Sequence, residues 1–221
     1  MRIFCKSIFT ISFWLATFTI VSGQTIQIPK GVPVSIDGRF SVEEWKDAVR
    51  QELIGGGEVH FKQDGAYLYV CLRGSKQGWG HVYVTRGDTV YVLHASAALG
   101  TAIYHRSNGG VWQPVQEFSW TMRDTSLSRE AVNAREKFLQ SYGWVANTVR
   151  MGTPGMLEFK IARKFLNSET PLLAALFASE PKSPQFWPPT LKDDCLAEKL
   201  IFGTTPADLK FNREGWAKLK L

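Results

Sequence analysis

The sequence has little cysteine, no run of charge of one sign, and a long apolar stretch only at its beginning. Three of its 221 residues are cysteine, which excludes a small protein held together by a disulfide framework. Basic residues outnumber acidic ones by 26 to 20, but they are scattered along the chain. Since nucleic-acid-binding proteins concentrate basic residues in patches, we expect no nucleic-acid partner.

Motifs of catalysis and metal binding are also missing. The chain has no Gly-x-Ser-x-Gly nucleophile motif, no histidine pair at metal-ligand spacing and no Cys-x-x-Cys-His motif for covalent haem. The four histidines, His60, His81, His94 and His105, all fall in segments that alternate like strands. His81 and His94 lie on neighbouring predicted strands, so their side chains are expected to come within reach of one another.

The apolar stretch at the beginning is typical of a signal peptide. Arg2 and Lys6 precede it, and Val21-Ser22-Gly23 provides small residues for cleavage before Gln24. We therefore expect residues 1–23 to be removed and the protein to be secreted, periplasmic or held at the cell surface, with no stable membrane span. The alternative is an uncleaved anchor helix, although the stretch is shorter than the ~18 to 20 apolar residues that a span needs.

Cleavage would leave 198 residues with a net charge of +4, since the removed segment has two basic and no acidic residues. This length suits one domain over residues 24–221, because single β-sandwiches reach ~200 residues. Two cysteines would remain, Cys71 and Cys195. An exported protein can form a disulfide, but Cys71 lies in an apolar strand, where a free thiol packs well. Free thiols are therefore favoured over a disulfide between them.

A short helix is predicted near the start of the mature chain. Ser41 and Glu44 have the spacing of a capping box, so a helix should begin at Val42. In such a helix Trp45 and Val49 would share one face.

A hairpin follows the short helix. Asp64-Gly65 separates two alternating runs over residues 58–62 and 66–73, and this dipeptide favours a type I′ turn. The second run is apolar on nearly both faces, which predicts a central strand. Further hairpins are predicted around Gly87-Asp88 and around residues 107–110.

One substantial helix interrupts the strand-like pattern. Leu127, Ala131, Ala134, Phe138 and Tyr142 form an apolar stripe at helical spacing. Ser126 or Asp124 is the expected cap at its start and Gly143 its expected end. Later strands are predicted over residues 144–149, 156–162, 172–179 and 196–202, and a proline-rich loop is predicted over residues 181–189. Trp216, near the end of the chain, should pack against the rest of the domain. The whole pattern predicts an all-β fold, an antiparallel, jelly-roll-like β-sandwich with one inserted helix.

The ordered set Ile36-Asp37-Gly38, Glu44-Trp45 and Asp64 to Leu72 resembles the start of the family 9 carbohydrate-binding modules and their DOMON-like relatives. The resemblance covers about 40 residues. It implies a secreted or surface-exposed antiparallel β-sandwich that binds sugar or, in some branches, haem. Because Trp45 belongs to this set, we expect it to lie in the core.

Tryptophan is the main sequence indication of a ligand site. The chain has eight tryptophans and 13% aromatic residues, and flat rings can stack on the C–H faces of sugars. The expected ligand platforms are Trp79 and Trp187, which fall in predicted loops, and Trp112, which follows the turn over residues 107–110. Trp120 and Trp144 border regular runs and should pack. The expected polar partners are Arg106, Asn108 and Gln113, near Trp112. For each of these six residues the alternative is ordinary packing or a solvated loop.

Other chemistry has weaker indications. Asp193-Asp194 and Asp88 are candidate calcium ligands without an EF-hand pattern. Haem would need a histidine and a methionine, for which Met122, Met151 and Met156 are available, but it is not expected. A hydrolase would need two facing carboxylates, and Glu117 and Glu158 are the first candidates.

The sequence thus predicts an exported, non-catalytic protein that binds a poly- or oligosaccharide by tryptophan stacking, with no cofactor. One alternative is a glycoside hydrolase or lyase on a sandwich scaffold. Another is an envelope protein with a structural or partner-binding role and no sugar site.

Overall fold

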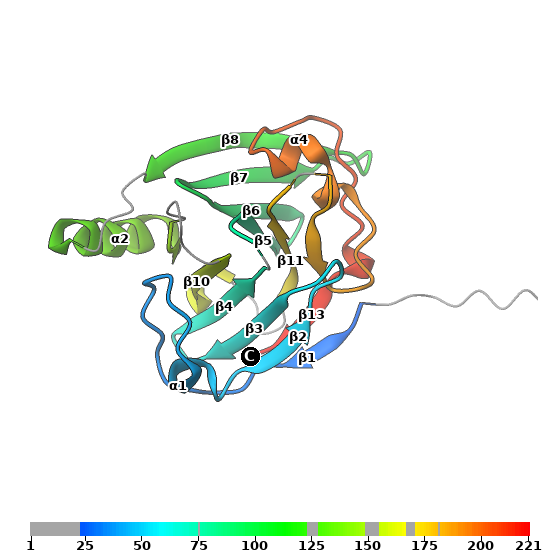
Figure 1. The fold of residues 1–221 in the computed structure, drawn as a ribbon. Coiled ribbons are helices and arrows are strands. Elements are labelled where there is room, and N and C mark those ends of the chain that lie inside the picture. Colours follow the sequence, from blue (N-terminus) through cyan, green and yellow to red (C-terminus); the bar gives the residue numbers. More distant parts are fainter. Residues whose placement is uncertain (1–22, 75, 123–127, 149–154, 167–170, 181) are drawn as a thin grey trace, which may run out of the picture.

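The computed structural model describes residues 23–74, 76–122, 128–148, 155–166, 171–180 and 182–221. Its strands form two sheets that face one another (Figure 1), so the predicted β-sandwich with one substantial helix is confirmed. The larger sheet has, in spatial order, β1 (Thr25–Gln27), β13 (Ala217–Lys220), β11 (Leu172–Ala178), β5 (Trp79–Arg86), β6 (Thr89–Ala95), β7 (Leu99–Arg106) and β8 (Trp112–Met122), with β12 (Gln185–Trp187) also paired to β11. The smaller sheet has β2 (Val49–Glu52), β3 (Glu58–Gln63), β4 (Tyr67–Arg73), β10 (Met156–Ala162) and β9 (Trp144–Ala146).

Four α-helices and two 3₁₀ turns complete the described part of the chain. The helices are α1 (Val42–Trp45), α2 (Arg129–Tyr142), α3 (Arg163–Leu166) and α4 (Glu198–Ile201), and the 3₁₀ turns are η1 (Asp194–Leu196) and η2 (Arg213–Gly215). Strand pairs are antiparallel except for β1 and β13, which run parallel. No helix within the described ranges is both long and apolar enough to cross a membrane. The signal peptide is predicted over residues 1–23, of which residues 1–22 lie outside these ranges.

The main core lies between the two sheets. Phe61 and Phe159 of the smaller sheet meet Leu93 and Ala175 of the larger one, all with no exposed surface. The predicted central position of the strand after Asp64-Gly65 is confirmed, because β4 pairs with β3 on one side and with β10 on the other. Both of its faces are apolar because Leu68, Val70 and Leu72 point into the main core, whereas Tyr69 and Cys71 are covered by the cluster around Trp45.

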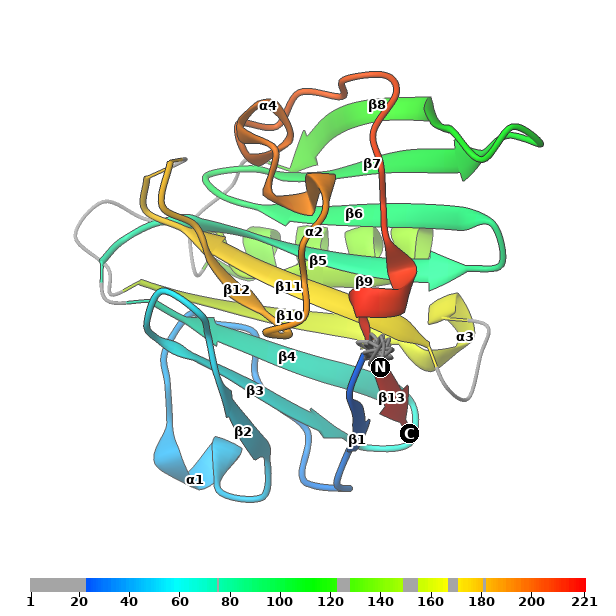
Figure 2. The same ribbon diagram turned by 90° about the vertical axis from the view of Figure 1, so that its right-hand side faces the viewer.

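The outer face of the larger sheet is covered by the chain from β12 to η2 (Figure 2), which forms a second core there. Tyr83 and Tyr104 donate hydrogen bonds from their hydroxyls to backbone carbonyls of this segment, at 3.0 and 3.1 Å. The predicted docking of Trp216 is confirmed, since it is 1% exposed and its Nε1 donates to Asp193 at 2.7 Å.

Cys71 and Cys195 are both free and buried, which confirms the favoured interpretation. Cys195 belongs to the core outside the larger sheet, whereas Cys71 belongs to a third cluster, with Trp45, outside the smaller one. The two thiols thus lie on opposite outer faces of the sandwich. The expected core position of Trp45 is also confirmed.

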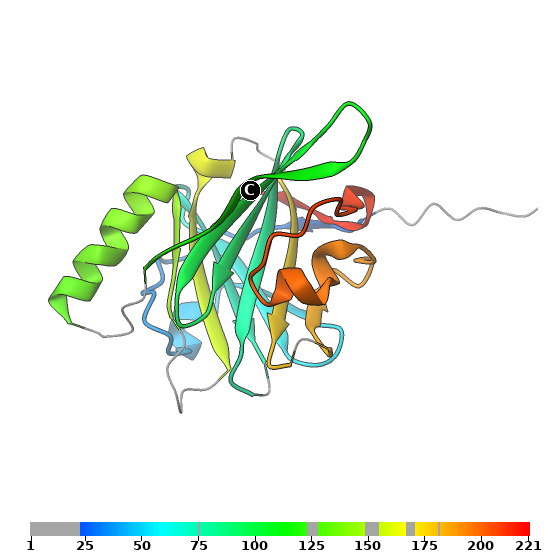
Figure 3. The same ribbon diagram turned by 90° about the horizontal axis from the view of Figure 1, so that it is seen from above.

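Helix α2 lies on one side of the sandwich and α4 on the other (Figure 3). Ser128 caps α2, because its side chain accepts a hydrogen bond from the Ala131 N–H. Gly143 ends it with a φ of 75° and an N–H bond to Leu139, as glycine commonly does. The predicted end of α2 at Gly143 is confirmed, but the residue that caps its start is Ser128 and not Ser126 or Asp124. Ser126, Asp124 and Leu127 lie outside the described residues.

Two local predictions near the start of the chain are wrong in detail. Helix α1 does begin after Ser41, but that residue makes no side-chain capping bond. Glu44 bonds instead to the N–H of Ser35. Val49 starts β2 and shares no helical face with Trp45. A four-residue helix held by its indole in the core needs no capping box to persist.

The β3–β4 hairpin is confirmed, but its turn is not type I′. Gly65 has a φ of 92°, whereas Asp64 is not among the residues with positive φ. The Asp64 carboxylate instead accepts the N–H groups of Ala66 and Tyr67, at 2.9 and 2.8 Å. This Asx-type turn spans more residues than the two of a type I′ loop.

The last third of the chain departs furthest from expectation. The strand predicted over residues 196–202 is wrong, because Glu198–Ile201 is helical. The predicted loop over 181–189 contains strand β12, and the strand predicted over 144–149 is described only as Trp144–Ala146. Short apolar runs fit either a helix or a strand, so only contacts with the sheet decide between them.

Candidate functional site

Two of the three tryptophans predicted to be displayed in loops are buried. Trp187 lies in β12 with no exposed surface and packs on Phe61, with ring centroids 4.7 Å apart. Trp112 begins β8 and is 2% exposed, because Phe211 of the C-terminal segment packs on it at 5.5 Å. The prediction that these two rings are exposed is therefore wrong, since later segments cover them.

The three predicted polar partners lie at the tip of the β7–β8 hairpin and are all exposed. Gln113 donates from Nε2 to Asp208 at 2.6 Å, and Arg106 borders a separate groove. Asn108 lies in the turn between the strands. Because Trp112 is buried, the structure does not gather these residues around an open ring.

Trp79 is the one of the three that keeps an exposed part. It begins β5 and is half-buried, and its Nε1 donates to the carbonyl of Ile201 at 2.8 Å. Its ring stacks on Phe202, with centroids 6.3 Å apart and planes 24° apart. Phe202 is 59% exposed, so this pair presents aromatic surface beside the end of α4.

A groove of about 450 Å³ lies between β8 and the chain around α4. One wall holds the half-buried rings of Phe118 and Trp120, which stack with centroids 5.1 Å apart and planes 17° apart. Its lining consists of Glu117, Phe118, Trp120, Lys199, Gly203, Thr204, Thr205 and Pro206. From the sequence, Trp120 is expected to pack, and Phe118 is not among the expected ligand platforms. Phe118 and Trp120 are two residues apart in a strand and therefore share one of its faces, next to Glu117. This spacing is the sequence pattern that could have indicated the site.

A β-bulge places Glu117 in the same groove as the two rings. The register passes from Thr101↔Ser119 to Ile103↔Gln116, so β8 has one residue more than β7 across this step. A bulge bends its strand and redirects side chains that would otherwise alternate between faces. Glu117 can therefore line the groove beside Phe118 although the two are adjacent in sequence.

Two glycines make room for the Trp120 indole. A Cβ atom at Gly100, its partner on β7, would lie 2.8 Å from the ring, and a Cβ at Gly203 would also lie 2.8 Å from it. Gly203 has a φ of 78°, which side chains disfavour. The indole thus fits between β7 and the chain after α4, and this close fit fixes its orientation.

A buried pair of histidines supports the rings from below. His94 packs edge-on against Trp120 at 4.9 Å, and its Nδ1 lies 2.9 Å from Nε2 of His81. Nε2 of His81 also lies 3.3 Å from the Ile201 carbonyl. Because a carbonyl can only accept, we assign the proton of His81 to Nε2. The predicted approach of these two histidines is confirmed.

Both imidazoles are neutral near pH 7. Burial lowers the pKa of His81 to about 3, against a smaller opposite effect of the Ile201 carbonyl. Burial, followed by the charge of His81, holds the pKa of His94 well below its ordinary value. The carbonyl of Ile201 accepts from both Trp79 and His81, so these bonds tie the end of α4 to the sheet.

The groove offers the groups that a polyhydroxylated ligand needs. Its two rings can stack on an apolar sugar face, the carboxylate of Glu117 can accept hydroxyl protons and the ammonium of Lys199 can donate. Within the described part of the chain, neither charged group forms a hydrogen bond or ion pair with another residue. The hydroxyl of Thr204 donates to the Lys199 carbonyl at 2.6 Å.

Glu158, a predicted hydrolase candidate, has a different place. It lies on β10 with no exposed surface and accepts from the N–H groups of Asp37 and Gly38 and from Nε1 of Trp45, at 3.3, 3.0 and 3.1 Å. Burial raises its pKa to about 7 despite these bonds. Glu158 and Glu117 lie on different sheets. They do not form the facing pair that a hydrolase requires, and Glu158 instead holds the Asp37-Gly38 turn.

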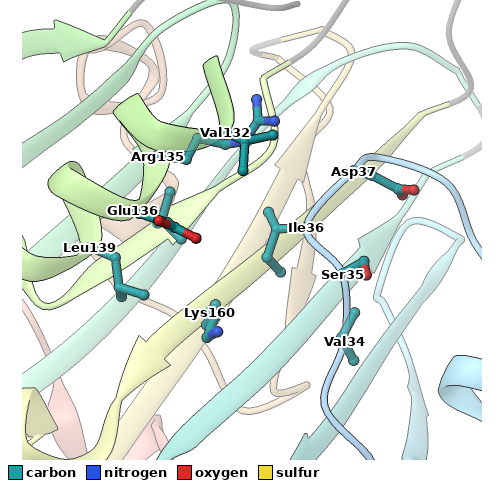
Figure 4. A pocket seen from close by; sticks show the side chains of 10 residues that line it. Val34, Ser35, Ile36, Asp37, Val132, Arg135, Glu136, Leu139 and Lys160 are labelled. Atoms are coloured by element: carbon teal, nitrogen blue, oxygen red, sulfur yellow. The ribbon is translucent and has the colours of Figure 1, made fainter. Parts of the chain in front are cut away.

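A second cavity, of about 350 Å³, lies between the loop before α1 and helix α2 (Figure 4). Ile36 and Leu139 approach it from opposite sides, with Lys160 between them on β10. Its complete lining is Val34, Ser35, Ile36, Asp37, Val132, Arg135, Glu136, Leu139, Val145 and Lys160. None of these is aromatic, so this cavity lacks the stacking surface of the groove at Trp120.

The described candidate ligands for calcium and haem either bond to other residues of the protein or lie apart from one another. Asp193 accepts from Cys195 and Asn212 backbone N–H groups and from Trp216, and Asp88 pairs with Arg213. Among the described residues, no group of three or more His, Cys, Asp or Glu side chains is arranged to hold a metal ion. Of the candidate haem ligands, Met156 is buried in the Trp45 cluster, Met151 lies outside the described residues, and the side chain of Met122 is not described.

Comparisons with known proteins place no family on this chain. No family model matches it, and no curated protein is significantly similar. It is similar to the crystal structure of a provisionally assigned carbohydrate-binding protein from Bacteroides uniformis, with a TM-score of 0.43 and 11% identity over 90% of this chain and 99% of that one. At this level the likeness carries no information about function.

Proposed function

We propose that this chain is an exported, non-catalytic carbohydrate-binding protein that holds a poly- or oligosaccharide in the groove between β8 and α4. The observation that carries the proposal is the stacked pair of half-exposed rings, Phe118 and Trp120, in a groove that Glu117 also lines. Recognition sites for small ligands combine aromatic surface with a few placed polar groups in this way.

The ring pair of Trp79 and Phe202 extends the aromatic surface on the other side of the chain after α4. Phe202 and Gly203 are adjacent in sequence, and Gly203 contacts Trp120 while Phe202 stacks on Trp79. A saccharide of several units can use both pairs. In this proposal Trp79 keeps the ligand role that its sequence context suggested, and Phe118 and Trp120 replace the buried Trp112 and Trp187.

Export rests on the signal-peptide pattern of residues 1–23, and sugar binding agrees with the resemblance of residues 36–72 to family 9 carbohydrate-binding modules. Arg106, Asn108 and Gln113 have no part in this groove, because they lie at the far tip of the β7–β8 hairpin. The proposal requires no cofactor.

Affinity electrophoresis in soluble polysaccharides and pull-down on insoluble ones test the proposal, followed by calorimetry with oligosaccharides of any binder. We expect Glu117→Gln to weaken binding about tenfold, the loss of one charge-assisted hydrogen bond. Glu198→Gln is the matched control, because Glu198 is exposed on α4 but does not line the groove, and it should bind like the wild type. No binding to any glycan, or equal losses in both variants, would refute the proposal.

A further inference from the structure

A second groove, of about 550 Å³, lies between the end of β7 and the C-terminal chain around η2. It is lined by Arg106, Leu172, Phe211, Asn212, Arg213, Glu214, Trp216 and Lys218. Phe211 and Trp216 are 6% and 1% exposed, so they form a firm floor. Three cations face this groove against one carboxylate.

Arg213 is held in a fixed orientation at this groove. Its Nη1 donates to the Gly87 carbonyl at 2.5 Å and its Nη2 to Asp88 at 3.3 Å, while the guanidinium lies 5.2 Å from the centre of the Trp112 ring. A guanidinium has five N–H donors, so donors remain after these bonds. A positioned guanidinium with spare donors is suited to bind a carboxylate or sulfate.

The other two cations have no partner within the described residues. Arg106 ends β7 and Lys218 lies in β13, both exposed, and neither forms an ion pair or a side-chain hydrogen bond there. They come from β7 and β13, which are not neighbours in the larger sheet, and both line this one groove. The opposing charges are Glu214, which also lines the groove, and Asp88, which pairs with Arg213 but is 65% exposed. Positive charge therefore exceeds negative charge in the groove.

We propose that this groove binds an oxyanion group, a carboxylate or sulfate, with Arg213 as the oriented donor and Arg106 and Lys218 as flanking cations. The group can belong to an acidic saccharide or to a free inorganic anion. The proposal does not depend on the groove at Trp120, which shares no lining residue with this one.

The test is a titration of the ¹⁵N-labelled full chain followed through the Trp216 indole N–H, which is bonded to Asp193 and lies at the groove floor. The probes are sodium sulfate and a trigalacturonate, each compared with sodium chloride at equal ionic strength. We expect saturable shifts with sulfate or trigalacturonate and none with chloride. Tighter binding of trigalacturonate identifies an acidic saccharide as the ligand, and equal or tighter binding of sulfate identifies a free anion.

Lys218→Gln and Arg106→Gln should each weaken binding about tenfold, as expected for one charge-assisted bond. Lys220→Gln is the matched control, since Lys220 is exposed on the same strand, β13, but does not line the groove. It should change affinity by less than about twofold. Shifts that only follow ionic strength, or an equal loss in the Lys220 variant, would overturn the proposal.

Discussion

Nε2 of His81 lies 2.9 Å from Nδ1 of His94, in a contact between neighbouring strands beneath the Trp120 ring. The register pairs these residues directly across β5 and β6. Both are buried and neutral at pH 7, and the carbonyl of Ile201 accepts from the same Nε2. The proposed sugar groove therefore rests on a polar pair that tolerates no extra proton.

Acid should destabilise the protein through this pair. The pKa values of His81 and His94 are lower in the folded protein than in the unfolded chain, so the unfolded chain takes up protons first as the pH falls. The free energy of unfolding is therefore undiminished above pH 6.5 and decreases as the pH falls toward 3. By pH 4 the loss from His81 should be on the order of 3 kcal/mol. Urea denaturation between pH 7 and pH 4 measures it, best in Glu158→Gln, which removes the opposing titration of Glu158.

His94→Phe should flatten this acid dependence, because it removes one buried imidazole while keeping a ring against Trp120. His105→Gln is the control, since His105 is exposed near the end of β7 and should leave the dependence unchanged. If the free energy of unfolding falls with pH equally steeply in the parent protein, in His94→Phe and in His105→Gln, the buried pair does not govern acid stability.

Glu158 should have the opposite pH dependence. Burial raises its pKa from 4.5 to about 7, so its contribution is complete below pH 4.5 and is lost as pH rises through 7. Between pH 5 and pH 8 the free energy of unfolding should fall by up to about 3 kcal/mol. Glu158→Gln should show no such fall. A wild type whose stability is level across this range would contradict the raised pKa.

Trp45→Phe tests the bond between the indole and this carboxylate. The substitution removes the Nε1 donor, 3.1 Å from Oε1 of Glu158, while a ring remains in the core. A hydrogen bond to a charged carboxylate is stronger than one to a protonated carboxyl group, so losing this bond costs more when Glu158 is charged. The destabilisation should therefore be larger at pH 8 than at pH 5, by about 1 kcal/mol. Chemical denaturation at both values measures this difference, and equal losses would mean that the bond is not charge-assisted.

Lys62→Met should destabilise the protein by about 2 kcal/mol at pH 7. Lys62 is fully buried and donates to Asp47 at 2.7 Å, and its ammonium lies 5.7 Å from the Trp45 ring centre. Burial tends to raise the pKa of Asp47, but Lys62 and the Val32 N–H lower it overall. The cost should therefore shrink as the pH falls through the lowered pKa of Asp47, where its carboxylate loses its charge. Lys46→Met, in an exposed pair with Glu43, should cost under about 0.5 kcal/mol.

The strands were predictable because their signals are local. Alternation and the turns at Asp64-Gly65 and Gly87-Asp88 define adjacent antiparallel pairs, and adjacency across β5 and β6 is what brings His81 to His94. The core position of Trp45 followed in the same way from the short segment around it.

The site was less predictable, because its exposure depends on contacts distant in sequence. Trp112 and Trp187 look like loop residues until Phe211 and Phe61 pack on them. The sequence around Trp120 predicts a packed strand residue. In the structure, one side of its ring stays open to a groove between β8, with the bulge beside Trp120, and the chain after α4. Neither the bulge nor the position of that chain has a signal in the neighbouring residues.

Gly203→Ala tests whether the fit of Trp120 matters for binding. Gly203 has a φ of 78°, and a Cβ there would lie 2.8 Å from the indole, so the substitution must both strain the backbone and displace the ring. Gly65→Ala is the matched control, because Gly65 has a φ of 92° but nothing within 4 Å of the new Cβ. Each variant should lose about 1 kcal/mol of stability from the backbone alone.

Only Gly203→Ala should also weaken saccharide binding and shift the fluorescence of Trp120. A saccharide that binds both variants equally well would mean that the ring orientation set by Gly203 is not part of recognition. Because the backbone strain is similar in the two proteins, a difference in affinity between them reports the displacement of the indole rather than a general loss of stability.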